Sequence, residues 1–226
     1  MNIDPAWLAP TYFLDYQTPS VQAFVRQAVG ADADAATPRE KAVRLYYAVR
    51  DGIRYDPYRF RVEREWYQAS HTLAEGAAYC VPKALLYAAG LRSLGIAARP
   101  GFADVKNHLA TERLLKVTGT DIFSWHGYVS LLLDGEWIKA TPVFNIEMCE
   151  RFQVLPLEFD GRNDSLMQPY DARNQRHMEY VKYHGEFDDL PYALLEQEMR
   201  RDYPGLIATA KGEALGDFEH EAIHKG

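Results

Sequence analysis

Cys80 is the residue whose type and surroundings point most directly to chemistry, because it stands two positions before Pro82 at the start of an apolar run. Proline lacks a backbone N–H and fits best in the first turn of a helix, so Cys80 is predicted to be the N-cap or the first residue of that helix. Unpaired N–H groups and the positive end of the helix dipole stabilise a thiolate there, which is the nucleophilic form of cysteine.

The same N–H groups could hold the oxyanion of a tetrahedral intermediate. Lys83 lies one turn into the helix and could lower the pKa of the thiol further. The competing interpretation is a buried cysteine that packs as a small apolar residue. It is the better interpretation of Cys149, which has no such context.

A nucleophilic thiol needs a base close by, and His126 is the histidine that lies in a clearly predicted strand. Two apolar runs, 124–133 and 136–141, flank Asp134-Gly135, which is typical of a hairpin with a two-residue turn. The competing interpretation of His126 is a core or rim residue packed beside its tryptophan neighbour.

The predicted hairpin register pairs Val143 with His126. Thr141 and Asn145 then become the two diagonal neighbours of His126 on one face of the sheet, roughly 7–8 Å away at the backbone. A catalytic base needs a third group to orient its ring, and either side chain has an oxygen to offer, although neither is a carboxylate. The choice between them stays open, and a β-bulge would undo the alternation on which it rests.

The remaining pattern predicts the elements that position these residues. Helices are expected at 18–29, 37–51, 80–95 and 192–201, the second with a Thr37/Glu40 capping box. A short extended piece is expected at 53–58 and a strand at 96–105. Loops are expected at 59–72 and through most of 145–190, with an irregular arm over 1–17 and a frayed tail after Gly205.

Two blocks of this chain resemble the transglutaminase-like superfamily. Residues 72–101 read TLAEGAAYCVPKALLYAAGLRSLGIAARPG, with a glycine before the cysteine and a Gly-Ile-x-x-Arg block after its helix. Residues 125–142 read WHGYVSLLLDGEWIKATP, which is similar to the family's histidine strand, hairpin and following aromatic-led strand. The segment 41–55 also resembles the helix that precedes that core.

The resemblance implies an α+β fold with a papain-like core, in which N-terminal helices and the nucleophile helix pack on an antiparallel sheet. It implies that Cys80 is the nucleophile and His126 the general base. The family's acidic third residue falls on Thr141, whose hydroxyl can accept a hydrogen bond but brings no negative charge. We expect one domain over 1–226, with the core at 18–145 and a loop-rich extension with a terminal helix at 146–226.

Composition excludes several classes of protein. The chain has 226 residues, a formal net charge of −7, 47% hydrophobic residues and 25% charged residues. The sequence shows no apolar run long enough to cross a membrane, no secretory signal, no basic stripe for nucleic acid and no phosphate-binding glycine loop. Two cysteines cannot build a disulfide framework, so a cytoplasmic location is expected. The oligomeric state is not indicated.

The sequence therefore predicts a cysteine-dependent acyl-transfer enzyme that hydrolyses an amide or peptide-like bond without cofactor or metal. A catalytically silent scaffold that binds a peptide or protein partner is the alternative. A zinc protease is a third hypothesis, since 220–224 read HEAIH and match H-E-x-x-H. That match stands two residues from the chain end with no third ligand after it, so a charged, frayed tail is the preferred interpretation.

Overall fold

The structure is a computed structural model that describes residues 3–108, 110–167, 178–209 and 218–221. Before the central helix come η1 (Pro5–Trp7), α1 (Pro19–Val29), α2 (Pro38–Gly52), β1 (Arg54–Tyr55), η2 (Arg64–Tyr67), α3 (Ala69–Glu75) and β2 (Ala77–Ala78). The central part comprises α4 (Cys80–Ser93), β3 (Ala98–Asn107), α5 (Glu112–Thr118), β4 (Ile122–Leu133) and β5 (Glu136–Ala140). Then follow α6 (Ile146–Phe152), β6 (Met178–Glu186), α7 (Tyr192–Asp202), α8 (Pro204–Thr209) and α9 (Phe218–Glu221).

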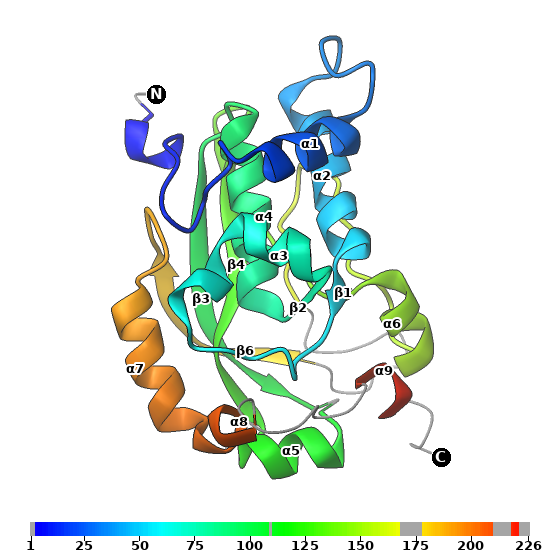
Figure 1. Cartoon of the computed structure of the whole chain (residues 1–226). Coiled ribbons are helices and arrows are strands. Elements are labelled where there is room, and N and C mark those ends of the chain that lie inside the picture. The colour runs from blue at the N-terminus through cyan, green and yellow to red at the C-terminus, as the bar shows by residue number, and fades with distance from the viewer. Residues whose placement is uncertain (1–2, 109, 168–177, 210–217, 222–226) are drawn as a thin grey trace.

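A four-stranded antiparallel sheet in the order β5-β4-β3-β6 forms the back of the molecule (Figure 1). Helix α4 packs against β4 and β3 on one side and against α1, α2 and α3 on the other. Every residue of α4 from Val81 to Arg92 is buried, which explains why its sequence is apolar on all sides. The predicted α+β arrangement, with the cysteine helix against an antiparallel sheet, is confirmed.

Two local predictions about helix starts are also confirmed. In α2, the Thr37 side chain accepts from the Glu40 N–H and the Glu40 carboxylate accepts from the Thr37 N–H, which is the expected capping box. In α4, Tyr79 is the N-cap, Cys80 is the first helical residue and Pro82 lies in the first turn. The proline therefore fixes where the helix begins.

The predicted hairpin forms with its expected register. Val129 pairs with Ala140 at one end of the ladder and Leu133 with Glu136 at the other. The turn residues Asp134 and Gly135 have φ values of 51° and 88°, as a two-residue hairpin turn requires. Strand β5 ends at Ala140, however, so the predicted pairing of His126 with Val143 does not form.

The structure differs from the sequence-based prediction most after residue 145. The segment 145–190 contains two elements that were not predicted, α6 and β6, and β6 joins the central sheet beside β3; its residues 168–177 lie outside the described part. Only Met178 is buried in β6, so this edge strand lacks the alternating apolar pattern by which strands are recognised. The predicted loop at 59–72 likewise contains η2 and the start of α3.

After Gly205, the described residues include α8 and α9 rather than a frayed tail, while 210–217 and 222–226 lie outside the described part. None of the helices in the described ranges combines the length and the apolar character that crossing a bilayer would require.

Candidate active site

Cys80 lies where the start of α4 meets β4. Its side chain keeps some contact with solvent through a cavity, yet protein surrounds it densely enough that burial raises the pKa of the thiol to about 11. The backbone N–H groups of Gly127, Val81 and Cys80 itself contact the sulfur and lower its pKa, but they do not offset burial. The predicted helix-start position is confirmed, whereas the prediction of a thiolate at neutral pH is not: the resting side chain is a thiol.

Lys83 does not act on this thiol, contrary to the sequence-based suggestion. Its ammonium is fully buried and donates to the carbonyl oxygens of Arg50, at 2.8 Å, and Ile53. Those carbonyls lie at and just beyond the C-terminal end of α2, which leaves them without helical partners. Burial lowers the pKa of Lys83 to about 7, and its role is to join α4 to the end of α2.

His126 lies on β4 directly before Gly127 and lines the same cavity as Cys80. Burial lowers the pKa of its ring to about 4, so the imidazole is neutral at pH 7. Within the described part of the chain, no hydrogen bond joins His126 to Cys80. The resting pair is therefore a neutral thiol beside a neutral imidazole rather than an ion pair.

A β-bulge in β4, directly before His126, sets the direction of the His126 side chain. Ala103 pairs with His126 and Val105 pairs with Phe123, so two residues of β4, Ser124 and Trp125, lie opposite a single residue of β3. Trp125 adopts the left-handed region with a φ of 60°, which is unfavourable for a bulky side chain.

Three contacts hold Trp125 in this conformation. Its backbone N–H donates to the Asp104 carboxylate at 3.1 Å, and its indole N–H donates to the Glu198 carboxylate at 2.5 Å. The His184 ring stacks on the indole, with centroids 4.6 Å apart, and itself bonds to Asp104 at 2.7 Å. This bulge could not be located from the sequence, because the residues that support it come from β3, β6 and α7.

The two predicted orienting residues have different surroundings. Thr141 is fully buried, and its Oγ1 atom has no hydrogen-bond partner among the described residues. Asn145 is engaged elsewhere, because its Oδ1 accepts from the Tyr55 N–H and its Nδ2 donates to Glu147, each at 2.9 Å. The hairpin ladder ends at Ala140, before both residues, so the difference between them is one of partners: both amide atoms of Asn145 are engaged elsewhere, whereas the Thr141 hydroxyl is not engaged within the described ranges, which makes Thr141 the stronger candidate.

Tyr180 on β6 is a site residue that the sequence analysis missed. Its ring packs edge-on against His126, with centroids 6.1 Å apart. The Thr141 hydroxyl lies close enough to lower the pKa of Tyr180, which burial raises, although the two hydroxyls do not meet hydrogen-bond geometry. Three buried polar atoms in the described ranges thus lack a partner in this one region: His126 Nε2, Thr141 Oγ1 and the Tyr180 hydroxyl.

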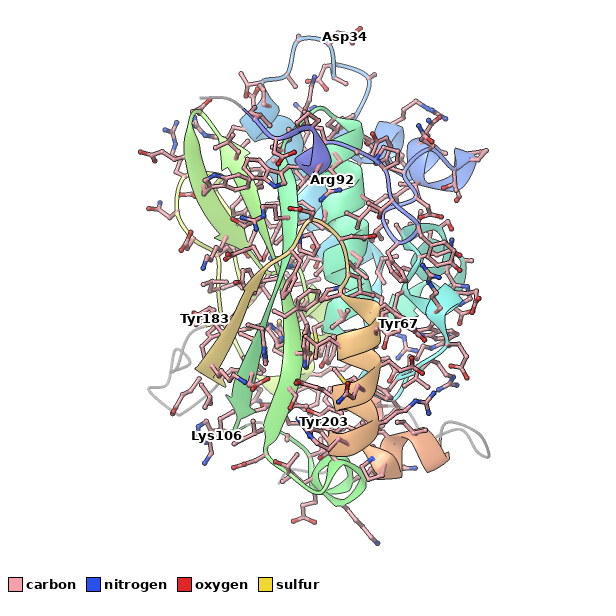
Figure 2. The ribbon with its side chains drawn as sticks, turned by 90° about the vertical axis from the view of Figure 1, so that its left-hand side faces the viewer. Asp34, Tyr67, Arg92, Lys106, Tyr183 and Tyr203 are labelled. Atoms are coloured by element: carbon pink, nitrogen blue, oxygen red, sulfur yellow. The ribbon has the colours of Figure 1, made fainter. Side chains whose placement is uncertain are left out.

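The cavity that Cys80 and His126 line is mainly apolar, with a volume of about 50 Å³ in which the centre of a water-sized molecule can lie. The other residues of its wall are Tyr55, Pro57, Phe60, Tyr79, Val105, Asn107, Leu114, Phe123, Ser124, Met178, Met199, Tyr203 and Leu206. Figure 2 shows Tyr203 close to the end of α7 and beside β4, which it contacts through Ser124. The arrangement can present a carbonyl carbon to the sulfur while excluding most water.

The structure offers no candidate metal centre within the ranges it describes, where no three His, Cys, Asp or Glu side chains gather. The H-E-x-x-H match cannot be placed, since His224 and the His220 side chain lie outside the described part.

Comparison with known proteins shows the family to which this chain belongs. Residues 23–142 match the family model of the transglutaminase-like superfamily, which is more than half of the chain, so the chain belongs to that superfamily. A crystal structure of a candidate cysteine protease from Cytophaga hutchinsonii matches with 17% sequence identity and a TM-score of 0.44, covering 80% of this chain and 53% of that one. The chain thus spans about half the length of that protein. No curated protein matches the sequence.

Proposed function

We propose that the protein is a cysteine-dependent acyl-transfer enzyme that hydrolyses an amide or peptide-like bond through a thioester at Cys80. The observation that carries the proposal is the meeting of Cys80, at a helix start, and His126, on the neighbouring strand, at the wall of one cavity. Membership of the transglutaminase-like superfamily supports it, because the resemblance of the two sequence blocks implies that Cys80 and His126 are the nucleophile and the base.

In the proposed reaction, the Cys80 sulfur attacks the acyl carbonyl carbon while His126 accepts the thiol proton. Nε2 of the imidazole is buried away from solvent, so the lone pair that accepts the proton is placed on Nδ1. The protonated imidazole returns that proton to the departing amine as the carbon–nitrogen bond breaks. Water then attacks the thioester, which releases the acid and restores the thiol.

The oxyanion that forms during attack is expected to lie near the backbone N–H groups that now contact the sulfur. Those of Cys80 and Gly127 are fixed by α4 and β4, so they need no rearrangement as charge develops. Hydrolysis is proposed over transfer to an amine because the described wall of the cavity carries no acidic side chain that would bind an ammonium group.

Trapping the acyl-enzyme tests the proposal. The protein is mixed with 4-nitrophenyl acetate, quenched in acid at short times and examined by intact-mass spectrometry and peptide mapping. One acetyl group is expected on Cys80 in the wild type and in the Cys149→Ser control, and none in Cys80→Ala. If Cys80 never becomes acylated, the alternative of a catalytically silent scaffold is favoured. Two observations support that alternative: the raised pKa of the Cys80 thiol and the lack of an acidic residue at the third position.

A further inference from the structure

We propose that the cavity beside Cys80 selects acyl groups that carry an uncharged, apolar side chain, such as that of leucine, methionine or phenylalanine. The proposal rests on the proposed function, since it treats Cys80 as the atom that becomes acylated. It adds the class of substrate, which neither the family nor the catalytic residues determine.

The first support is the composition of the wall. Aromatic and aliphatic side chains from β3, β4, α5, α7 and α8 surround the space next to the sulfur, and the described wall holds no Asp, Glu, Lys or Arg. A charged side chain that entered this cavity would lose its hydration and find no counter-ion, whereas an apolar one would gain from leaving water.

The second support is that Ser124 and Tyr203, polar residues of the wall apart from the proposed catalytic pair, already have partners within the protein. The Ser124 hydroxyl donates to Asp202 at 2.9 Å, and the Ser124 N–H donates to the Tyr203 hydroxyl. The Tyr203 hydroxyl in turn donates to the Ile122 carbonyl at 3.4 Å. These groups are not available to compensate a charged ligand, so they do not weaken the preference for an apolar one.

The third support is where the wall comes from. Met178, Met199, Tyr203 and Leu206 lie beyond the segment 23–142 that matches the family model. In Figure 2, α7 runs alongside the sheet, and its Met199 lines the cavity. The C-terminal part of this chain therefore adds four apolar residues to a wall that the shared core also builds.

The test compares N-acetyl aminoacyl chloromethyl ketones of leucine, phenylalanine, glutamate and lysine, which place each side chain next to the carbonyl and alkylate the sulfur. The rate of Cys80 alkylation at limiting reagent, followed by intact mass, should be on the order of 100-fold higher for leucine and phenylalanine than for glutamate and lysine. Iodoacetamide, which has no side chain, provides the intrinsic reactivity of the thiol for each variant.

A charged side chain introduced into the cavity wall should change the order of the alkylation rates among the four ketones. Phe123→Lys is the chosen variant because Phe123 is only partly buried, so the fold should tolerate the change. It should slow alkylation by the leucine reagent and speed alkylation by the glutamate reagent relative to iodoacetamide. Ile122→Lys is the matched control, since Ile122 is the adjacent residue of β4, is 38% exposed and does not line the cavity.

The outcomes separate the two proposals. If 4-nitrophenyl acetate acylates Cys80 but the four ketones react at similar rates, the acyl-transfer proposal stands and the apolar selection is wrong. Equal behaviour of Phe123→Lys and Ile122→Lys would also overturn the selection. If neither the ester nor any ketone modifies Cys80, both proposals fail together.

A different observation points to a second assignment: the geometry assigns Tyr180 as a positioning residue for His126. The hydroxyls of Tyr180 and Thr141 and the Nε2 atom of His126 are buried polar groups without partners in the described part of the chain, and they lie in one region. Buried polar atoms are costly unless they are satisfied, so these three, which have no partner among the described residues of the resting structure, are expected to bond to one another when the imidazole becomes protonated, and thereby to orient the ring. Tyr180 and Thr141 would then supply the oxygen atoms that an acidic third residue would otherwise provide.

Tyr180→Phe tests this assignment, with Tyr183→Phe as its control. The Tyr183 ring stacks on that of Tyr180 at 5.3 Å, but its side chain is half exposed and lies at the outer edge of the sheet (Figure 2). Tyr180→Phe should lower kcat roughly 3- to 10-fold with KM unchanged and shift the acidic limb of the kcat–pH profile. Adding Thr141→Asp, which offers Nε2 a carboxylate, should restore kcat.

A merely structural role would lower stability without moving the pH profile. The assignment is overturned if Tyr180→Phe and Tyr183→Phe share one kcat and one pH profile. It is also overturned if adding Thr141→Asp to Tyr180→Phe does not restore kcat.

Discussion

Replacing His126 by alanine should slow acylation of Cys80 by about 10²- to 10⁴-fold while the fold is retained. With a thiol pKa of about 11, only about one cysteine in ten thousand is a thiolate at pH 7, so attack depends on a base that removes the proton during the reaction. His126 is the titratable base that shares the cavity wall with the sulfur. The measurement is the stopped-flow rate of the acylation burst, with circular dichroism to establish folding.

His71→Ala serves as the control, because His71 lies on α3 against Trp66 and is not part of the cavity wall. Its acylation rate should equal that of the wild type. A loss of less than fivefold in His126→Ala would contradict the assigned role of His126.

The same pair of pKa values predicts an unusual pH profile. His126 is neutral above a pKa of about 4 and Cys80 is protonated below about 11, so the reactive thiol–imidazole form persists between these values. We therefore expect kcat/KM to be flat from pH 5 to 8 for the wild type. An acidic limb near pH 6.5 would show instead that the imidazole titrates as an unperturbed histidine.

Gly127→Ala should lower the acylation rate by about 10²-fold, because Gly127 is where β4 touches the helix that carries the nucleophile. A Cβ atom there would lie 3.1 Å from the Val81 Cα, 3.1 Å from the Ala84 Cβ and 3.2 Å from the Cys80 carbonyl oxygen. Two of those atoms are backbone, so β4 and α4 must separate, and His126 moves away from Cys80 with its strand. Overpacking of this kind also costs about 1–3 kcal/mol of stability.

Gly52→Ala is the matched control for this change. Gly52 ends α2, and an added Cβ there meets no atom within 4 Å. Acylation kinetics and urea unfolding should show both effects for Gly127→Ala and neither for Gly52→Ala. Wild-type kinetics in a folded Gly127→Ala protein would mean that the spacing of β4 and α4 does not set the reaction geometry.

Local rules explain what could be predicted from the sequence. Pro82 fixed the start of α4 and with it the position of Cys80, because a missing N–H suits only the first turn of a helix. Asp134 and Gly135 fixed the register of the hairpin because both adopt positive φ. The superfamily was recognised from these same two blocks, and its match over 23–142 confirms the recognition.

Features set by distant parts of the chain could not be predicted. The helix start favours a thiolate locally, but dense packing around Cys80 from segments before and after α4 raises its pKa instead. If the hairpin continued to alternate, Asn145 would lie beside His126. The ladder ends at Ala140, however, and the Asn145 amide oxygen accepts a hydrogen bond from the Tyr55 N–H instead. Tyr180 was missed because β6 is an edge strand with a single buried residue and no apolar alternation.

The division of the cavity wall between two parts of the chain has a consequence for how the protein can diverge. The sulfur and the imidazole are held by α4 and β4, while four wall residues come from β6, α7, α8 and the residue that joins these two helices. Exchanging residues 178–206 among relatives should therefore retune the preferred acyl group while the reacting atoms stay in place. Selectivity and reactivity can then evolve as separate traits within one polypeptide.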